Sequence, residues 1–185
     1  LGKSQHRKDA DILLISHNHF DHLSVEDIKQ VINSKTSIVA AKECVDQLES
    51  LSSDITAVKP GDKVSVQGIP IEAVAAYNTN KTFHPKADGK VGFVITLNNT
   101  RIYHAADTDI IPEMSSVHPD VALVPVSGTY VMTSEEAARA INEKIKPAKL
   151  AIPMHYAAIV GTEKDAEKFK ELVKVCPVQI LALES

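Results

Sequence analysis

Apolar residues recur along the chain with two periods, and segments of the two kinds alternate from one end to the other. Short runs rich in Ile and Val predict strands, whereas apolar residues spaced three and four positions apart predict amphipathic helices. The predicted strands are 11–15, 37–40, 55–58, 63–67, 70–77, 91–97, 101–104, 121–126, 150–154 and 178–183. The predicted helices are 25–32, 42–51, 134–145 and 163–173.

Helix starts and chain reversals carry their own sequence signals. Ser24, Thr133 and Thr162 each precede a predicted helix and are followed three residues later by Asp or Glu, which is the pattern of an N-terminal cap. Segments 59–62 and 98–100 predict turns, because Pro fixes φ and because Gly and Asn tolerate left-handed backbone. Residues 78–90 lack periodicity and carry three Lys, which predicts an exposed loop. No repeat or linker divides the chain, so residues 1–185 are interpreted as one α/β domain with a mixed sheet.

Composition narrows the class of protein. With 185 residues, 44% of them apolar, the chain can bury one core without disulfides. A net charge of −4 and the absence of a basic run argue against nucleic acid as a partner, and no apolar run approaches the ~20 residues needed for membrane insertion. Cys44 and Cys176 are far apart and are predicted to be small buried residues, which fits a reducing cytoplasm. Nothing in the sequence indicates an oligomeric state.

The unusual count is eight His, of which three fall in a HxHxDH segment at residues 17–22. This segment directly follows the first predicted strand. The rigid backbone at the end of a strand can direct closely spaced imidazoles toward one point. Imidazole and carboxylate are ligands that suit Zn²⁺, and a site without thiolates suits catalysis better than a structural role. The segment therefore predicts a catalytic metal site.

One ion cannot easily use His17, His19, Asp21 and His22 together from so short a loop, whereas two neighbouring ions can. Further ligands are then required, and three candidates lie at predicted strand ends or in loops: His84, Asp107 and His155. His104 competes with His84, but a histidine inside a strand is more often hydrogen-bonded in the core. We expect His104 to support the site from behind the ligands.

Three segments together resemble the metallo-β-lactamase superfamily: residues 17–22, residues 102–109 (Ile-Tyr-His-Ala-Ala-Asp-Thr-Asp) and residues 153–156 (Pro-Met-His-Tyr). Within it, the chain is similar to small metal-dependent hydrolases related to L-ascorbate 6-phosphate lactonase and N-acyl phosphatidylethanolamine phospholipase D. The resemblance implies a four-layer αββα sandwich of two mixed sheets. It also implies that His17, His19 and His84 bind one ion, that Asp21, His22 and His155 bind a second, and that Asp107 bridges the two.

Three positions depart from the family pattern. Only ten residues precede the first predicted strand, where family members have two or three strands, so the N-terminal strands are expected to be shortened or missing. Ala106 stands where Gly usually precedes the bridging Asp. Tyr77 stands where a His ligand often ends its strand, which leaves His84 to supply that ligand.

The resulting hypothesis is a dinuclear metal hydrolase. A hydroxide held between two divalent ions would attack a phosphoester or a lactone, and Asp21 would orient it and accept its proton. Zn²⁺ is the expected metal, with Mn, Fe, Ni and Co also compatible with these ligands. Lys81, Lys86 and Lys90 favour a small anionic substrate. The alternative is a non-catalytic metal-binding protein of the same fold.

Several residues near the expected ligands are candidates for support of the ligands or contact with substrate. A tyrosine at a strand end is, however, more often a packing residue. The candidates are His104, Thr108, Tyr130 and Tyr156, with Tyr77, Asp109 and Thr129 also near strand ends.

Overall fold

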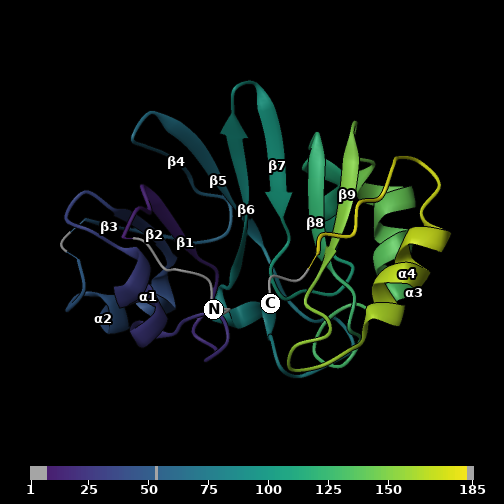
Figure 1. Ribbon diagram of the computed structural model, residues 1–185, viewed down its shortest axis with the longest axis horizontal. Helices are drawn as coiled ribbons and strands as arrows, with labels where there is room; N and C mark the ends of the chain where they lie inside the picture. The colour runs from purple at the N-terminus through teal and green to yellow at the C-terminus, as the bar shows by residue number, and fades with distance from the viewer. Residues whose placement is uncertain (1–7, 53, 183–185) are drawn as a thin grey trace.

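The computed structural model describes residues 8–52 and 54–182 and arranges them in four layers, with two sheets between outer helices (Figure 1). The strands are β1 (Ile12–Ile15), β2 (Ser37–Ala41), β3 (Ile55–Val58), β4 (Lys63–Val66), β5 (Ile69–Ala75), β6 (Val91–Leu97), β7 (Thr100–His104), β8 (Val121–Pro125) and β9 (Leu150–Met154). The α-helices are α1 (Val25–Val31), α2 (Val45–Leu48), α3 (Ser134–Arg139) and α4 (Glu163–Leu172). Short 3₁₀ turns are η1 (Lys42–Cys44), η2 (Lys86–Asp88) and η3 (Pro112–Ser116), and η4 (Ala140–Ile145) is π-helical.

The smaller sheet has the order β1-β2-β3, and every pairing in it is parallel. Helix α1 makes the crossover from β1 to β2, and η1 with α2 makes the crossover from β2 to β3, so each strand returns in the same direction. All five residues of the central strand β2 are buried. Two sheets were predicted and are found, but within the described residues this one is parallel rather than mixed.

The larger sheet has the order β4-β5-β6-β7-β8-β9 and is mixed, as predicted. Strands β4 to β7 pair antiparallel, and β7, β8 and β9 pair parallel. The turn between β6 and β7 consists of Asn98 and Asn99, with φ of 47° and 62°, which confirms the hairpin predicted from the tolerance of Asn for left-handed backbone. Because β7 to β9 run in parallel, their carboxyl ends share one edge of the sheet.

Two hydrophobic clusters hold the layers together. One joins the smaller sheet and its helices to β5 and β6, with Ile38, Leu48 and Phe93 among its fully buried side chains. The other packs α3 and α4 against β5 to β9, with Tyr103 and Phe169 at its centre. Figure 1 shows the corresponding helices on opposite outer sides of the molecule.

Three predicted caps or ends are confirmed, and one predicted strand is wrong. The Ser24 side chain accepts from the Asp27 N–H, Thr133 and Glu136 form a reciprocal capping box, and the helix that starts there ends at Ile145. Residues 178–182 form no strand, because after Pro177 only Val178 bridges to β9, at Ala151. Leu183 lies outside the described residues.

No helix in the described part of the chain is long and apolar enough to cross a membrane.

Candidate metal centre

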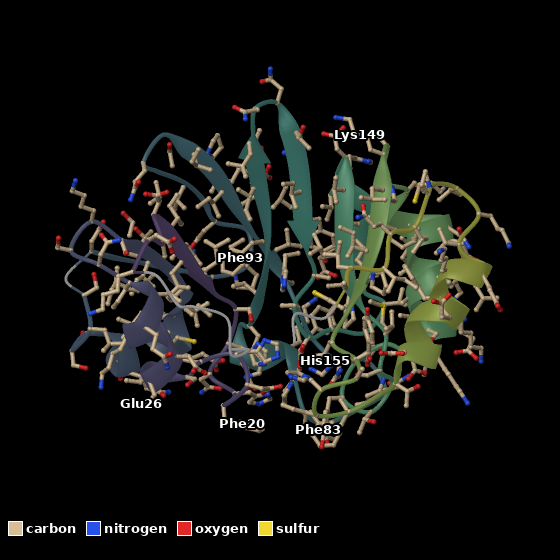
Figure 2. The ribbon with its side chains drawn as sticks, in the orientation of Figure 1. Phe20, Glu26, Phe83, Phe93, Lys149 and His155 are labelled. Carbon is tan, nitrogen blue, oxygen red and sulfur yellow. The ribbon has the colours of Figure 1, made fainter. Side chains whose placement is uncertain are left out.

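The candidate ligands gather at one edge of the two sheets. His17 follows β1, Asp107 follows β7, His155 follows β9, and His84 lies in the connection from β5 to β6. Figure 2 shows His155 at the lower edge of the molecule, on the opposite side from Lys149 at the start of the parallel strands. Ligand sites in open α/β sheets lie beyond the carboxyl ends of the strands, and this cluster follows that rule.

A tight turn presents the ligands of the HxHxDH segment. The His22 and Leu23 N–H groups both donate to the His19 carbonyl oxygen, at 2.9 and 2.8 Å. His17 is buried at the end of β1, while Asp21 and His22 are partly exposed, with side chains 23% and 17% accessible. The turn therefore places His17 in the buried part of the cluster and Asp21 and His22 nearer to solvent.

The potential ligand atoms form three groups, each within 4.8 Å. They are His17 with His19 and His84, His17 with His22 and Asp107, and Asp21 with His22 and His155. All seven residues expected to bind metal occur in these groups, and the first and third match the two sites implied by the family resemblance. His104, the rival of His84, is in none of the three.

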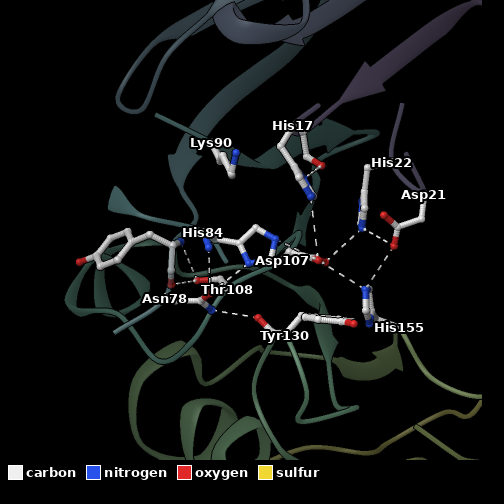
Figure 3. Close-up of polar contacts among 12 residues, drawn as sticks. His17, Asp21, His22, Asn78, His84, Lys90, Asp107, Thr108, Tyr130 and His155 are labelled. Carbon is white, nitrogen blue, oxygen red and sulfur yellow. Dashed lines mark hydrogen bonds and ion pairs between the residues drawn. The ribbon is translucent and has the colours of Figure 1, made fainter. Parts of the chain in front are cut away.

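Asp107 lies at the centre of the cluster (Figure 3). Its Oδ1 atom is 3.3 Å from His22 Nε2, and its Oδ2 atom is 3.3 Å from His84 Nε2 and 3.4 Å from His155 Nε2. His17 Nε2 is 3.9 Å from Oδ2. The Asp107 side chain is 4% exposed, so its two oxygens face imidazoles of both groups rather than water.

Several of these atoms are buried without a hydrogen-bond partner. They are His17 Nε2, His22 Nε2, His84 Nε2 and Asp107 Oδ1. A buried polar atom without a partner is costly, and such atoms normally pair with protein, water or an ion. Because these four converge and carry ligands suited to divalent transition metals, the residues fit a metal centre.

Hydrogen bonds on the far side of three imidazoles turn their Nε2 atoms toward the cluster. His17 Nδ1 is 2.9 Å from Ser16 Oγ, His84 Nδ1 is 3.1 Å from Asn78 Oδ1, and His155 Nδ1 is 3.0 Å from Ser127 Oγ. The Asn78 oxygen can only accept, so the His84 ring carries its proton on Nδ1 and leaves Nε2 free to bind a metal.

Burial and charge set the protonation of the cluster. Burial, with the neighbouring His22, lowers the pKa of His17 to about 2, and burial also lowers the pKa of His19. Burial would raise the pKa of Asp107, but the imidazoles of His155, His22 and His84, each within 3.4 Å of its carboxylate, outweigh burial and lower that pKa. Burial opposes a charge on His155, yet Asp107 beside it raises the pKa of the imidazole. His17 and His19 are therefore neutral and able to bind metal at neutral pH.

Comparisons with known proteins support the same assignment. The sequence profile of the beta-lactamase superfamily domain matches residues 1–155. The UPF0173 metal-dependent hydrolase Ta0764 of Thermoplasma acidophilum is 34% identical over 167 residues, which are 88% of this chain and 72% of the relative. The chain belongs to the metallo-β-lactamase superfamily. Within it, the chain is a metal-dependent hydrolase, which favours the enzyme interpretation over a non-catalytic one.

Further relatives of this hydrolase agree in sequence and in structure. The UPF0173 metal-dependent hydrolase SAR1785 of Staphylococcus aureus is 29% identical over 183 residues, covering 93% of this chain and 79% of the relative. The crystal structure of a protein assigned as a metal-dependent hydrolase from Parabacteroides distasonis superposes with a TM-score of 0.81 at 33% identity, covering 95% and 78% of the two chains. The metallo hydrolase Igni18 from Ignicoccus hospitalis shares the fold, with a TM-score of 0.75.

In this hydrolase the connection of residues 78–90 is largely exposed, as the sequence predicted, but Asn78, His84 and Lys90 within it are buried. Asn78 and His84 are 8% and 1% exposed, because the Asn78 side chain accepts from the His84 N–H at 3.0 Å and donates to the Tyr130 carbonyl at 3.0 Å. Sequence reasoning missed Asn78, Ser16 and Ser127. Their only signal was their position, directly at or just after the end of a strand.

The three lysines of this connection do not form an anion site, because each pairs with a carboxylate. Lys81 Nζ is 2.6 Å from Asp109, and Lys86 Nζ is 2.9 Å from Glu113. Lys90 Nζ lies between Glu43 and Asp88 at 3.1 and 3.2 Å, with its side chain 4% exposed. These pairings remove the argument from lysines for an anionic substrate.

Thr108 and Asp109 anchor the ligand loops and do not contact the pocket. The Thr108 hydroxyl is fully buried, accepts from the Tyr77 N–H at 3.2 Å, and lies 3.1 Å from the Tyr77 carbonyl oxygen. The Asp109 carboxylate accepts from the Thr79 N–H at 2.8 Å and from Lys81. These bonds hold the start of the connection from β5 to β6 against the segment that carries Asp107.

His104 lies next to the metal centre and acts there as a hydrogen-bond acceptor. Its Nδ1 atom accepts from the Ala106 N–H at 3.3 Å, which steadies the backbone before Asp107. Burial, with His22 nearby, lowers the pKa of His104 to about 4, so the ring is neutral. Ala106 itself has φ of 56°, so the left-handed conformation that suits Gly is adopted here by Ala.

The two tyrosine candidates have different positions. Tyr156 is 9% exposed and belongs to the hydrophobic cluster under α4, and it also lines a smaller pocket together with Asp21, His22 and His155. Tyr130 lines a pocket of about 470 Å³ beside the metal centre, and its ring meets the Phe83 ring edge-on with centroids 4.7 Å apart. Tyr77 points elsewhere, with its hydroxyl 3.0 Å from Glu113, and Thr129 is exposed.

Proposed function

We propose that this hydrolase uses two divalent cations to cleave an ester-type bond of a small molecule. His17, His19 and His84 would hold one cation, Asp21, His22 and His155 the other, and Asp107 would contribute to both. The observation that carries the proposal is the Asp107 carboxylate, which lies 3.3–3.4 Å from imidazole nitrogens on both sides.

The chemistry follows from the ligands and from the pocket next to them. When bound, divalent cations supply Lewis acidity, which polarises an ester and lowers the pKa of an attacking water from ~15.7 to ~7. Asp21 lines the pocket and is 23% exposed, whereas Asp107 is 4% exposed. Asp21 is therefore the carboxylate that can orient water and accept its proton. His104 does not line this pocket and acts by holding the Ala106 backbone in place.

The bond cleaved is proposed to be a phosphoester or a lactone or related carboxylic ester. Both have an electrophilic centre bearing an oxygen on which negative charge develops during attack by water. Zn²⁺ is the first metal to test, followed by Mn, Fe, Ni and Co, because imidazole and carboxylate accept all of them.

Metal content and turnover measured together test this proposal. We expect elemental analysis of the saturated protein to give two ions per chain, and we expect EDTA to abolish ester hydrolysis that added Zn²⁺ or Mn²⁺ restores. His17→Ala and His155→Ala should each lose at least one ion. His118→Ala is the matched control, because His118 is an exposed histidine away from the cluster. Full activity with a single ion, or activity that survives EDTA, would contradict the proposal.

A further inference from the structure

The pocket beside the metal centre has two chemically distinct parts. Its floor is formed by candidate ligands, including His19, His84 and Asp107. Its walls are large apolar side chains from four separate segments: Phe20, Phe83, Tyr130 and Ile159. A molecule whose ester lies at the ligands would therefore extend its remaining atoms between these apolar walls.

The walls are unusually exposed for side chains of their type. Phe20 is 76% exposed, Phe83 48% and Ile159 57%. Seven large hydrophobic side chains in the described residues are exposed, and three of them line this one pocket. Figure 2 shows Phe20 and Phe83 at the same lower edge as His155. Contiguous exposed apolar side chains around a polar centre are typical of a ligand-binding site.

The pocket offers no positive side chain other than its histidines. Within the described part of the chain, neither Lys nor Arg lines it. The nearby Lys81 is 15% exposed and bound to Asp109, and Lys90 is buried between Glu43 and Asp88. A charged group on the part of the substrate away from the metal centre would lose its hydration among these apolar side chains without gaining a partner.

We propose that the substrate carries an uncharged alkyl or aryl arm that binds between Phe20, Phe83, Tyr130 and Ile159. This inference rests on the proposed function and specifies its substrate class. In the carboxylic ester case, the oxygen of water bonds to the carbonyl carbon and the bond from that carbon to the ester oxygen breaks. The alcohol leaves with one proton of the water, and the acid keeps the other or releases it.

Chain-length dependence of turnover tests the arm. The probes are p-nitrophenyl acetate, hexanoate and hemisuccinate, together with methyl and hexyl p-nitrophenyl phosphate, each rate divided by that of spontaneous hydrolysis. Each buried methylene is worth a factor of about 4 in affinity, so burial of two gives a preference of about 15-fold. We expect kcat/KM to rise at least about tenfold from short to long arm in whichever series is turned over, and the hemisuccinate to be the poorest carboxylic ester.

Variants locate the preference in the pocket. Ile159→Ala should lower the long-to-short ratio of kcat/KM at least about threefold, and Phe20→Leu should lower it in the same direction. Leu97→Ala is the matched control, because Leu97 is an apolar residue, 40% exposed, at the end of β6 and outside this pocket. Calorimetric binding of octanoate and acetate to the Zn²⁺-loaded protein gives a second measurement that needs no turnover.

The outcomes separate this inference from the proposed function. Metal-dependent turnover without a chain-length preference, or with a preference for the hemisuccinate, would overturn the apolar arm and leave the proposed function intact. No turnover, combined with binding of octanoate that Ile159→Ala weakens, would support the arm and overturn the proposed reaction. A third outcome would overturn the inference: Ile159→Ala keeps the long-to-short ratio of kcat/KM but no longer sediments with phosphatidylcholine vesicles. The exposed apolar side chains around the pocket would then bind a lipid surface.

Discussion

Asn78→Ala should weaken one metal site without removing any ligand. Asn78 accepts from the His84 N–H at 3.0 Å and from the His84 ring at 3.1 Å, so the substitution leaves two buried donors without a partner. Each such donor costs about 1–3 kcal/mol, and the ring loses the contact that fixes its proton on Nδ1. Loss of support behind a metal-bound histidine typically costs 10–100-fold in affinity, or about 1.4–2.8 kcal/mol.

Competition of Zn²⁺ with a coloured chelator measures this effect site by site. We expect the affinity of one ion to fall 10–100-fold, while the ion held by the group of Asp21, His22 and His155 keeps its affinity. Asn80→Ala is the control, because Asn80 lies two residues further along the same connection and is exposed. Wild-type affinity at both sites in Asn78→Ala, or equal weakening at both, would refute the role given to Asn78.

Three further predictions concern stability and charge. Ala106→Gly should raise the free energy of unfolding by about 0.5–1 kcal/mol in urea titrations. The left-handed backbone at this position costs Ala about 1–2 kcal/mol, and the greater conformational freedom of Gly in the unfolded chain offsets part of that gain. Destabilisation by the substitution would contradict this prediction. In the metal-free protein the pKa of His17 and of His104 is lowered to about 2 and about 4. Below pH 6.5 the unfolded chain therefore binds protons at these two histidines that the folded protein does not. The free energy of unfolding is highest above pH 6.5 and falls below it by about 1.4 kcal/mol per pH unit for each histidine. The raised pKa of His155 offsets part of this loss. Urea melts at pH 7.5, 6 and 5 check the slope, and a flat profile would contradict it. Asp107→Asn should lower the pKa of His155 in an NMR titration and reduce metal content, and an unchanged pKa would show that Asp107 is not its cause.

Local patterns were sufficient for most strands, the helix caps and the turn of Asn98 and Asn99. They also located the HxHxDH segment, because its ligands are presented by a single turn and need no knowledge of distant contacts. Residues 178–182 were misassigned because an apolar run after a Pro resembles a strand whether or not a neighbour is free to pair with it. The parallel order of the smaller sheet likewise depends on how its crossovers pack, which the alternation of residues does not encode.

The support of the metal centre depends on pairs that are distant in sequence. Lys90 pairs with Glu43, 47 positions away, and Asn78 donates to Tyr130, 52 positions away. Three lysines in one connection therefore suggested an exposed basic loop, although the fold places a carboxylate beside each of them. His84 was preferred over His104 because of its place outside a strand, and the grouping of potential ligand atoms agrees with that choice.

The position of the candidate ligands has a consequence for how the molecule unfolds. His17 follows β1, whose hydrophobic cluster also includes β5 and β6, while Asp107 and His155 follow strands of the second cluster. Cations seated among these side chains would add a cross-link to the packing, the hydrogen bond from Val91 N–H to the Ser16 carbonyl and the Lys90–Glu43 ion pair that already join the two sheets. At 100 times the dissociation constant, one bound ion adds about 2.7 kcal/mol to the folded state. Loading the metal centre would thus couple the two clusters into one cooperative unit, and stripping it would allow each to open by itself.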